Sequence, residues 1–115
     1  MQERRQFLRL DTRLPLHYGL LPSGPKQPAV SSNLSAGGLR LVAQAHVQPE
    51  TRLWIELQLP GRTAPVAFIG EVVWSEQRDL KGVSPVEIGV RFVEIAPDDL
   101  QAVLQYVIDS AGSPG

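Results

Sequence analysis

The sequence contains no cysteine. The chain can therefore form no disulfide, thiolate metal site or cysteine nucleophile, and this composition is compatible with the reducing cytoplasm. No apolar run approaches the ~20 residues that a membrane-spanning helix requires, and residues 1–7 lack the apolar core of a signal peptide. We therefore expect a cytoplasmic protein with no membrane insertion.

An excess of charge of one sign is also absent. Eleven Lys and Arg face twelve Asp and Glu, and the net charge is −1. Proteins that bind nucleic-acid polymers usually carry a basic surface, and single-strand-binding barrels also expose several aromatic side chains on one face. Aromatic residues make up only 6% of this chain. We therefore expect no nucleic-acid polymer as a partner and rank an oligonucleotide-binding barrel low, and any anion site must be local.

The 115 residues are 43% hydrophobic, which suits one domain with a single core. Six segments have the apolar pattern of strands; in the first of them Leu14, Leu16, Tyr18 and Leu20 share one side. The segments are 13–20, 28–32, 39–43, 53–59, 66–74 and 86–92. After Pro97 the period changes to that of an amphipathic helix.

This pattern predicts an all-β domain with one C-terminal helix, in which six strands form an antiparallel β-barrel. A two-sheet sandwich is the competing architecture. We expect a flexible N-terminal arm over residues 1–12, the barrel and helix over 13–109, and a disordered tail over 110–115.

Arg5 and Arg9 form an R-x-x-x-R spacing, and Arg4 precedes it. Guanidinium groups can bind a phosphate in a bidentate manner, stack on a flat base, or bind the O6/N7 edge of guanine. Taken alone, this run is better explained as a solvated basic arm.

Asn33, Ser35 and Gly38 lie in a segment that has the residue types of a turn between two strands. Short polar side chains and glycines there could present a surface that a ligand approaches closely. A plain β-turn is the better explanation when this segment is considered by itself. The combination of both segments in one barrel-like chain changes that balance.

Together, Arg5-x-x-x-Arg9 and Asn33-x-Ser35-x-x-Gly38 resemble the two motifs of the PilZ domain family, whose members bind the bacterial second messenger cyclic di-GMP. The segments 70–74 (GEVVW) and 88–92 (IGVRF) are also similar to that family, and the resemblance spans about residues 3–108. It implies a six-stranded antiparallel barrel with a C-terminal helix, in agreement with the hydropathy pattern.

The resemblance also implies roles for single residues. Arg5 and Arg9 would contact the phosphates and guanines, and Asn33, Ser35 and Gly38 would form the opposing surface. An arginine at position 4, next to the first motif arginine, is compatible with a stacked pair of ligand molecules, and the number of ligand molecules, one or two, stays open. Gln6 departs mildly from the family, because that position is often basic.

Trp74 ends the fifth predicted strand, where its ring could stack on a guanine. A partly buried tryptophan at the rim or in the core is an equally good interpretation. His17 and His46 have no metal-ligand spacing, and no group of residues has the pattern of a catalytic site. We expect neither a metal nor a cofactor, and no enzymatic activity.

The sequence thus predicts a receptor for cyclic di-GMP that signals to an unidentified downstream protein. The alternative is an interaction module with the same fold that works without a nucleotide in a motility, pilus or polysaccharide-synthesis complex.

Overall fold

The computed structural model describes residues 8–77 and 85–111, which contain seven strands and one helix. In chain order the elements are β1 (Arg9–Asp11), β2 (Pro15–Leu20), β3 (Gln27–Ser35), β4 (Gly38–Ala43), β5 (Arg52–Leu57), β6 (Val66–Gln77), β7 (Val86–Ile95) and α1 (Pro97–Ala111).

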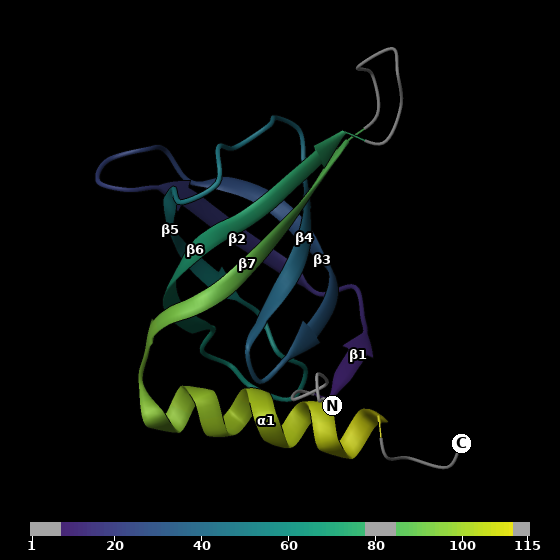
Figure 1. Cartoon of the computed structure of the whole chain (residues 1–115). Helices are drawn as coiled ribbons and strands as arrows, with labels where there is room; N and C mark the ends of the chain where they lie inside the picture. Colours follow the sequence, from purple (N-terminus) through teal and green to yellow (C-terminus); the bar gives the residue numbers. More distant parts are fainter. Residues whose placement is uncertain (1–7, 78–84, 112–115) are drawn as a thin grey trace, which may run out of the picture.

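Six of the strands close into a barrel, which Figure 1 shows from the side. Their hydrogen-bonded order is β3-β2-β5-β6-β7-β4, and β4 pairs again with β3, which closes the cylinder. All of these pairings are antiparallel. The predicted fold class is therefore confirmed, and the alternative of a two-sheet sandwich is wrong.

β1 is a strand that the hydropathy pattern did not predict. It pairs with the last three residues of β3, whereas β2 pairs with the first four residues along the same edge. Because β3 is nine residues long, β2 alone does not cover this edge, and β1 continues it. The C-terminal end of the expected arm, residues 9–11, is thus part of the barrel wall.

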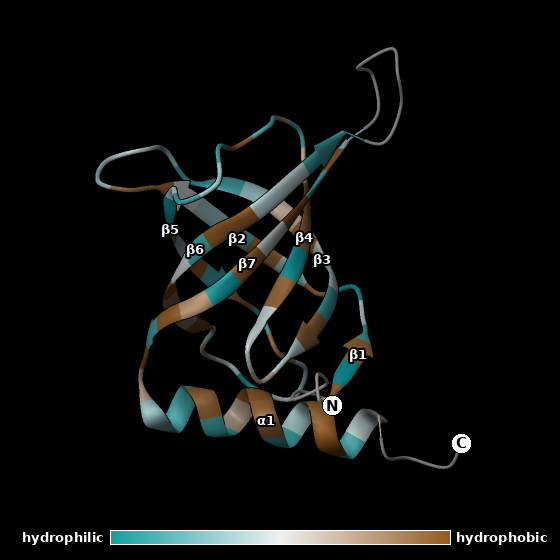
Figure 2. Cartoon of the chain, in the orientation of Figure 1, coloured by the Kyte–Doolittle hydropathy of each residue, from teal (hydrophilic) through white to brown (hydrophobic). Residues whose placement is uncertain are grey.

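Alternating apolar side chains fill the barrel, and Figure 2 shows hydrophobic and hydrophilic residues alternating along the strands. Leu14, Leu16 and Tyr18 are buried, as predicted. Leu20 was expected on the same side but is 37% exposed, because β2 ends there and the chain turns at residues 21–23. Burial raises the pKa of Tyr18 above its ordinary value.

Helix α1 lies across one end of the barrel, close to β1 and β3 (Figure 1). Val103 and Val107 are fully buried on its inner face. Asp98 and Asp99 occupy its first turn, where negative charge favours the positive end of the helix dipole. The helix continues to residue 111, beyond the expected boundary at 109. Among the described residues, no helix is long and apolar enough to cross a membrane.

Residues 12–14 join β1 to β2 and are held by Ser31 of β3. The Ser31 hydroxyl accepts a hydrogen bond from the Leu14 N–H at 2.9 Å and donates one to the Thr12 carbonyl at 2.5 Å. The Thr12 hydroxyl is in turn 3.2 Å from the Tyr106 hydroxyl of α1. This connection therefore links β1, β3 and the helix.

Candidate functional site

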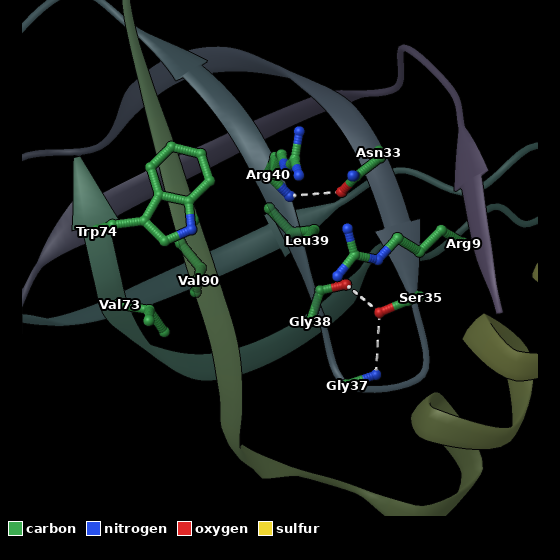
Figure 3. A pocket seen from close by; sticks show the side chains of 11 residues that line it. Arg9, Asn33, Ser35, Gly37, Gly38, Leu39, Arg40, Val73, Trp74 and Val90 are labelled. Carbon is green, nitrogen blue, oxygen red and sulfur yellow. Dashed lines mark hydrogen bonds between the residues drawn. The ribbon is translucent and has the colours of Figure 1, made fainter. Parts of the chain in front are cut away.

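An open depression on the outer wall of the barrel brings together residues from β1, β3, β4, β6 and β7 (Figure 3). It is lined by Arg9, Asn33, Ser35, Gly37, Gly38, Leu39, Arg40, Val73, Trp74, Gly89 and Val90. Five of the seven residues that the sequence suggested for a ligand site are among them, namely Arg9, Asn33, Ser35, Gly38 and Trp74.

The turn in this region is shorter than the sequence suggested. Residues 33–35 belong to β3, and β4 begins at Gly38, so only residues 36–37 form the turn. Strand pairing continues because β1 and β4 hydrogen-bond to β3 on its two edges. Asn33 and Ser35 are consequently neighbours on the outer face of a strand.

The Ser35 hydroxyl closes this turn. It accepts a hydrogen bond from the Gly37 N–H at 3.2 Å and donates one to the Gly38 carbonyl at 3.3 Å (Figure 3). Such side-chain bonds to a nearby backbone are typical of serine in turns. Ser35 therefore shapes the floor of the depression.

Asn33 holds the neighbouring strand. Its side-chain oxygen accepts a hydrogen bond from the Arg40 N–H of β4 at 3.1 Å. The β3–β4 register shifts between Ser31 and Asn33, so this side-chain hydrogen bond joins the two strands where their backbone pairing is irregular. Within the described residues, the amide NH2 group of Asn33 has no hydrogen-bond partner and can donate to a ligand.

Gly38 is needed where β4 approaches β7 closely. It lies opposite both Ser35 and Arg91, and a Cβ atom at this position would overlap the carbonyl oxygen of Val90. A backbone oxygen cannot move aside as a flexible side chain can. The last residue of the N-x-S-x-x-G motif therefore has a packing role in the barrel itself.

Arg9 is exposed on β1 and pairs with Ser35 across the strands. Its side chain reaches from β1 toward Ser35 and Gly38 in Figure 3. Arg4 and Arg5, the other arginines of the predicted cluster, lie outside the described residues.

Trp74 is half-buried on the outer face of β6, so it is a wall of the depression and not part of the core. The β6–β7 register shifts between Val72 and Trp74, and Trp74 pairs with Gly89. A Cβ atom at Gly89 would overlap the indole ring, so the ring lies directly over this glycine. This packing holds an aromatic surface at the edge of the depression.

Sequence reasoning missed Arg40, Val73 and Gly89. Arg40 lies between the buried Leu39 and Leu41, so strand alternation could have assigned it to the outer face. Its proximity to Trp74 depends on the pairing of β4 with β7 and of β7 with β6. No local pattern contains that information.

The depression carries positive charge with no carboxylate among its lining residues. Arg9 and Arg40 are its charged groups, and in the described part of the chain neither guanidinium takes part in an ion pair. By contrast, Arg52 and Arg91 both contact Glu71, at 3.4 and 3.1 Å. A chain with a net charge of −1 therefore still has a local site suited to an anion.

The two histidines lie in different elements. His17 belongs to β2, and His46 follows β4, where its Nδ1 is 2.9 Å from the Ser75 hydroxyl. Among residues 8–77 and 85–111, no group of three or more His, Asp or Glu side chains is arranged to hold a metal ion.

A model of the PilZ domain family matches residues 3–109, which include both motifs. The chain belongs to the PilZ domain family. The resemblance seen in the sequence is thereby confirmed, and the barrel with its C-terminal helix agrees with it. A search of curated proteins found no match.

Solved structures share the fold of this PilZ domain. The Bacillus subtilis inhibitor of motility MotI/DgrA is 27% identical, with a TM-score of 0.79 over 96% of this chain and 52% of its own. The PilZ domain with c-di-GMP of YcgR from Escherichia coli is 19% identical, with a TM-score of 0.72 over 94% of this chain and 91% of that one.

The K. pneumoniae MrkH–c-di-GMP complex is 16% identical, with a TM-score of 0.69 over 96% of this chain and 52% of that one. At such identities, the likeness to YcgR and MrkH shows the fold alone. The PilZ domain described here spans about half the length of the MotI/DgrA and MrkH chains.

Proposed function

We propose that this PilZ domain is a bacterial receptor for cyclic di-GMP that passes the binding event to a partner protein. One observation carries the proposal: Arg9 and Arg40 flank the Asn33–Ser35 segment in a depression whose lining has no carboxylate and includes an indole ring. The YcgR and MrkH structures with the same fold are complexes with c-di-GMP.

The ligand's chemistry suits these groups. Cyclic di-GMP has two phosphodiester charges and two guanines, so it requires converging cations, hydrogen-bond donors for base edges and a flat apolar surface. Arg9 supplies a guanidinium to a phosphate or guanine, and Trp74 supplies the surface on which a base stacks. Arg4 and Arg5 would add further guanidinium groups from the arm, as the family motif implies.

In this proposal the N-x-S-x-x-G motif acts mainly through shape. The Ser35 hydroxyl is engaged with the Gly37 and Gly38 backbone, and the Asn33 oxygen with the Arg40 N–H. The motif thus shapes the floor against which the dinucleotide rests, and the Asn33 NH2 group remains as a donor to the ligand.

A path for the signal follows from the packing near β1. Arg9 begins β1, and the connection that follows β1 reaches helix α1 through the Thr12–Tyr106 contact. Contacts between a bound ligand and the N-terminal arm would change the conformation of this connection and, through it, the surface near the helix that a partner protein contacts.

PilZ domains are binding or adaptor domains. We propose that this one has no enzymatic activity, acts in the cytoplasm and requires a downstream protein.

Isothermal titration with cyclic di-GMP tests the receptor directly. The wild type is expected to bind, and Arg9→Ala is expected to weaken binding by about tenfold or more, because a charge-assisted hydrogen bond contributes roughly 1.5–3 kcal/mol. The Arg5→Ala, Arg9→Ala double variant should bind more weakly still. Arg62→Ala is the matched control, since Arg62 pairs with Asp99 outside the depression.

No heat of binding from the folded wild type, or equal affinity in the double variant and the control, would refute the proposed receptor function.

No feature of the described part of the site favours the alternative of a nucleotide-independent interaction module. The MrkH structure is described as that of a c-di-GMP-dependent transcription regulatory factor. At 14% identity this likeness shows only the fold, and we retain the proposal that no nucleic-acid polymer binds here.

A further inference from the structure

Arg40 lies at one end of a row of three paired residues on the outer wall. In the sheet, Arg40 of β4 pairs with Gly89 of β7, and Gly89 pairs with Trp74 of β6. Gly89 has no side chain, so the two flanking side chains meet above it. The Arg40 guanidinium carbon is 5.5 Å from the centre of the Trp74 ring.

The backbone of Arg40 is held in place from the other side. Its N–H donates to the Asn33 side-chain oxygen at 3.1 Å. Its strand neighbours Leu39 and Leu41 are buried in the core. The base of the Arg40 side chain is therefore fixed, and Figure 3 shows Arg40 between Asn33 and Trp74.

The guanidinium itself has donors to spare. Among the described residues, the Arg40 guanidinium contacts the Trp74 ring and forms neither an ion pair nor a hydrogen bond. A guanidinium carries five N–H donors, and stacking on an aromatic ring leaves its in-plane donors available. A half-buried arginine with unused donors beside an aromatic wall fits a purine base.

We propose that Arg40 is the residue of this site that selects guanine over adenine, with Trp74 as the stacking surface beside it. This inference rests on the proposed binding of cyclic di-GMP. Guanine presents two acceptors, O6 and N7, which match two donors of one guanidinium. Adenine presents an N6–H2 donor in place of O6, which faces the arginine donors unfavourably.

The two residues have separable effects. Stacking on an aromatic side chain is nearly independent of which base stacks. Loss of the Trp74 ring therefore weakens guanine and adenine dinucleotides alike, whereas loss of the Arg40 guanidinium changes their ratio. The two phosphate charges are the same in both ligands, so the ratio also cancels the general effect of removing a positive charge.

The experiment measures dissociation constants of cyclic di-GMP and cyclic di-AMP for the wild type, Arg40→Gln and Trp74→Ala by calorimetry. The wild type is expected to prefer cyclic di-GMP. Arg40→Gln should reduce that preference by about tenfold or more, since a bidentate contact to guanine discriminates by roughly 1–3 kcal/mol. Trp74→Ala should weaken both ligands and leave the ratio unchanged.

Lys26→Gln is the matched control, because Lys26 lies 5.2 Å from the centre of the Trp54 ring in the same kind of contact and does not line the depression. It should change neither affinity nor ratio. Thermal melting of each variant confirms folding. An Arg40→Gln protein that keeps the wild-type ratio overturns the role of Arg40 and leaves the receptor intact. A folded wild type that binds neither dinucleotide overturns both proposals.

Discussion

The replacement of Ser31 by alanine should destabilise the whole domain although it removes a single oxygen atom. Ser31 is fully buried, and its hydroxyl is the partner of the Leu14 N–H and the Thr12 carbonyl. A buried group that loses its hydrogen-bond partner costs about 1–3 kcal/mol, and a second lost hydrogen bond adds about 0.5–1.5 kcal/mol. We expect a loss of roughly 2–4 kcal/mol in the free energy of unfolding.

Thermal unfolding measures this loss. For a domain of about this size, 1 kcal/mol corresponds to about 4 °C in Tm, so Ser31→Ala should lower Tm by roughly 8–16 °C. Ser75→Ala is the matched control, because the Ser75 hydroxyl bonds to the His46 Nδ1 at an exposed position and accepts a long, part-buried hydrogen bond of 3.4 Å from the Val47 N–H. Water replaces the exposed partner and a bond of that length contributes little, so the decrease in Tm should stay below about 4 °C.

The same variant also tests the link between folding and the site. Residues 12–14 place β1 and therefore Arg9, so ligand affinity should fall even at a temperature where Ser31→Ala is fully folded. A Tm within 2 °C or so of the wild type would refute the reasoning, because it would show that water satisfies both backbone groups.

Three further perturbations have equally definite expected outcomes. Gly38→Ala should lower Tm strongly or prevent folding, since its Cβ atom would overlap the Val90 carbonyl; a wild-type melting curve would contradict the required close approach of β4 and β7. Val107→Ala should lower the free energy of unfolding in urea by about 2 kcal/mol, because Val107 is fully buried. Ile108→Ala should lower it by less than about 0.5 kcal/mol, because Ile108 is 46% exposed. Equal losses in the two variants would argue against the packing of α1 on the barrel. Burial raises the pKa of Tyr18 above its ordinary value, so the unfolded chain loses this proton first and the free energy of unfolding should fall as pH rises above about 10. Tyr18→Phe should reduce this fall in thermal melts recorded from about pH 8 to about pH 11. An identical pH profile in that variant would disprove the argument.

Local hydropathy patterns were sufficient to predict most of the strands and the helix. Strict alternation predicted the buried side of β5 and most of β2, and the change of period after Pro97 predicted α1. Leu20 was misassigned because alternation does not show where a strand leaves the barrel wall. β1 was missed because three residues are too few to show a period, and its pairing depends on the unpaired length of β3.

The candidate site divides in a similar way. The two motifs directed attention to Arg9, Asn33, Ser35 and Gly38, and the structure places all four along one depression. The structural roles of these residues could not be predicted from the motifs. The turn is only two residues long, and the Asn33 oxygen accepts a hydrogen bond from the backbone of Arg40, which the motif does not include.

From the amino-acid order alone came the apolar pattern of most strands and of the helix, the absence of thiol chemistry and a local basic motif on a nearly neutral chain, because each depends on composition or on near neighbours in the sequence. Only the tertiary structure decided that Arg40, Gly89 and Trp74 form one row. These residues are brought together by the pairing of β4 with β7 and of β7 with β6 and by the register shift between Val72 and Trp74, and strand register over long sequence separations is set by the packing of the whole sheet.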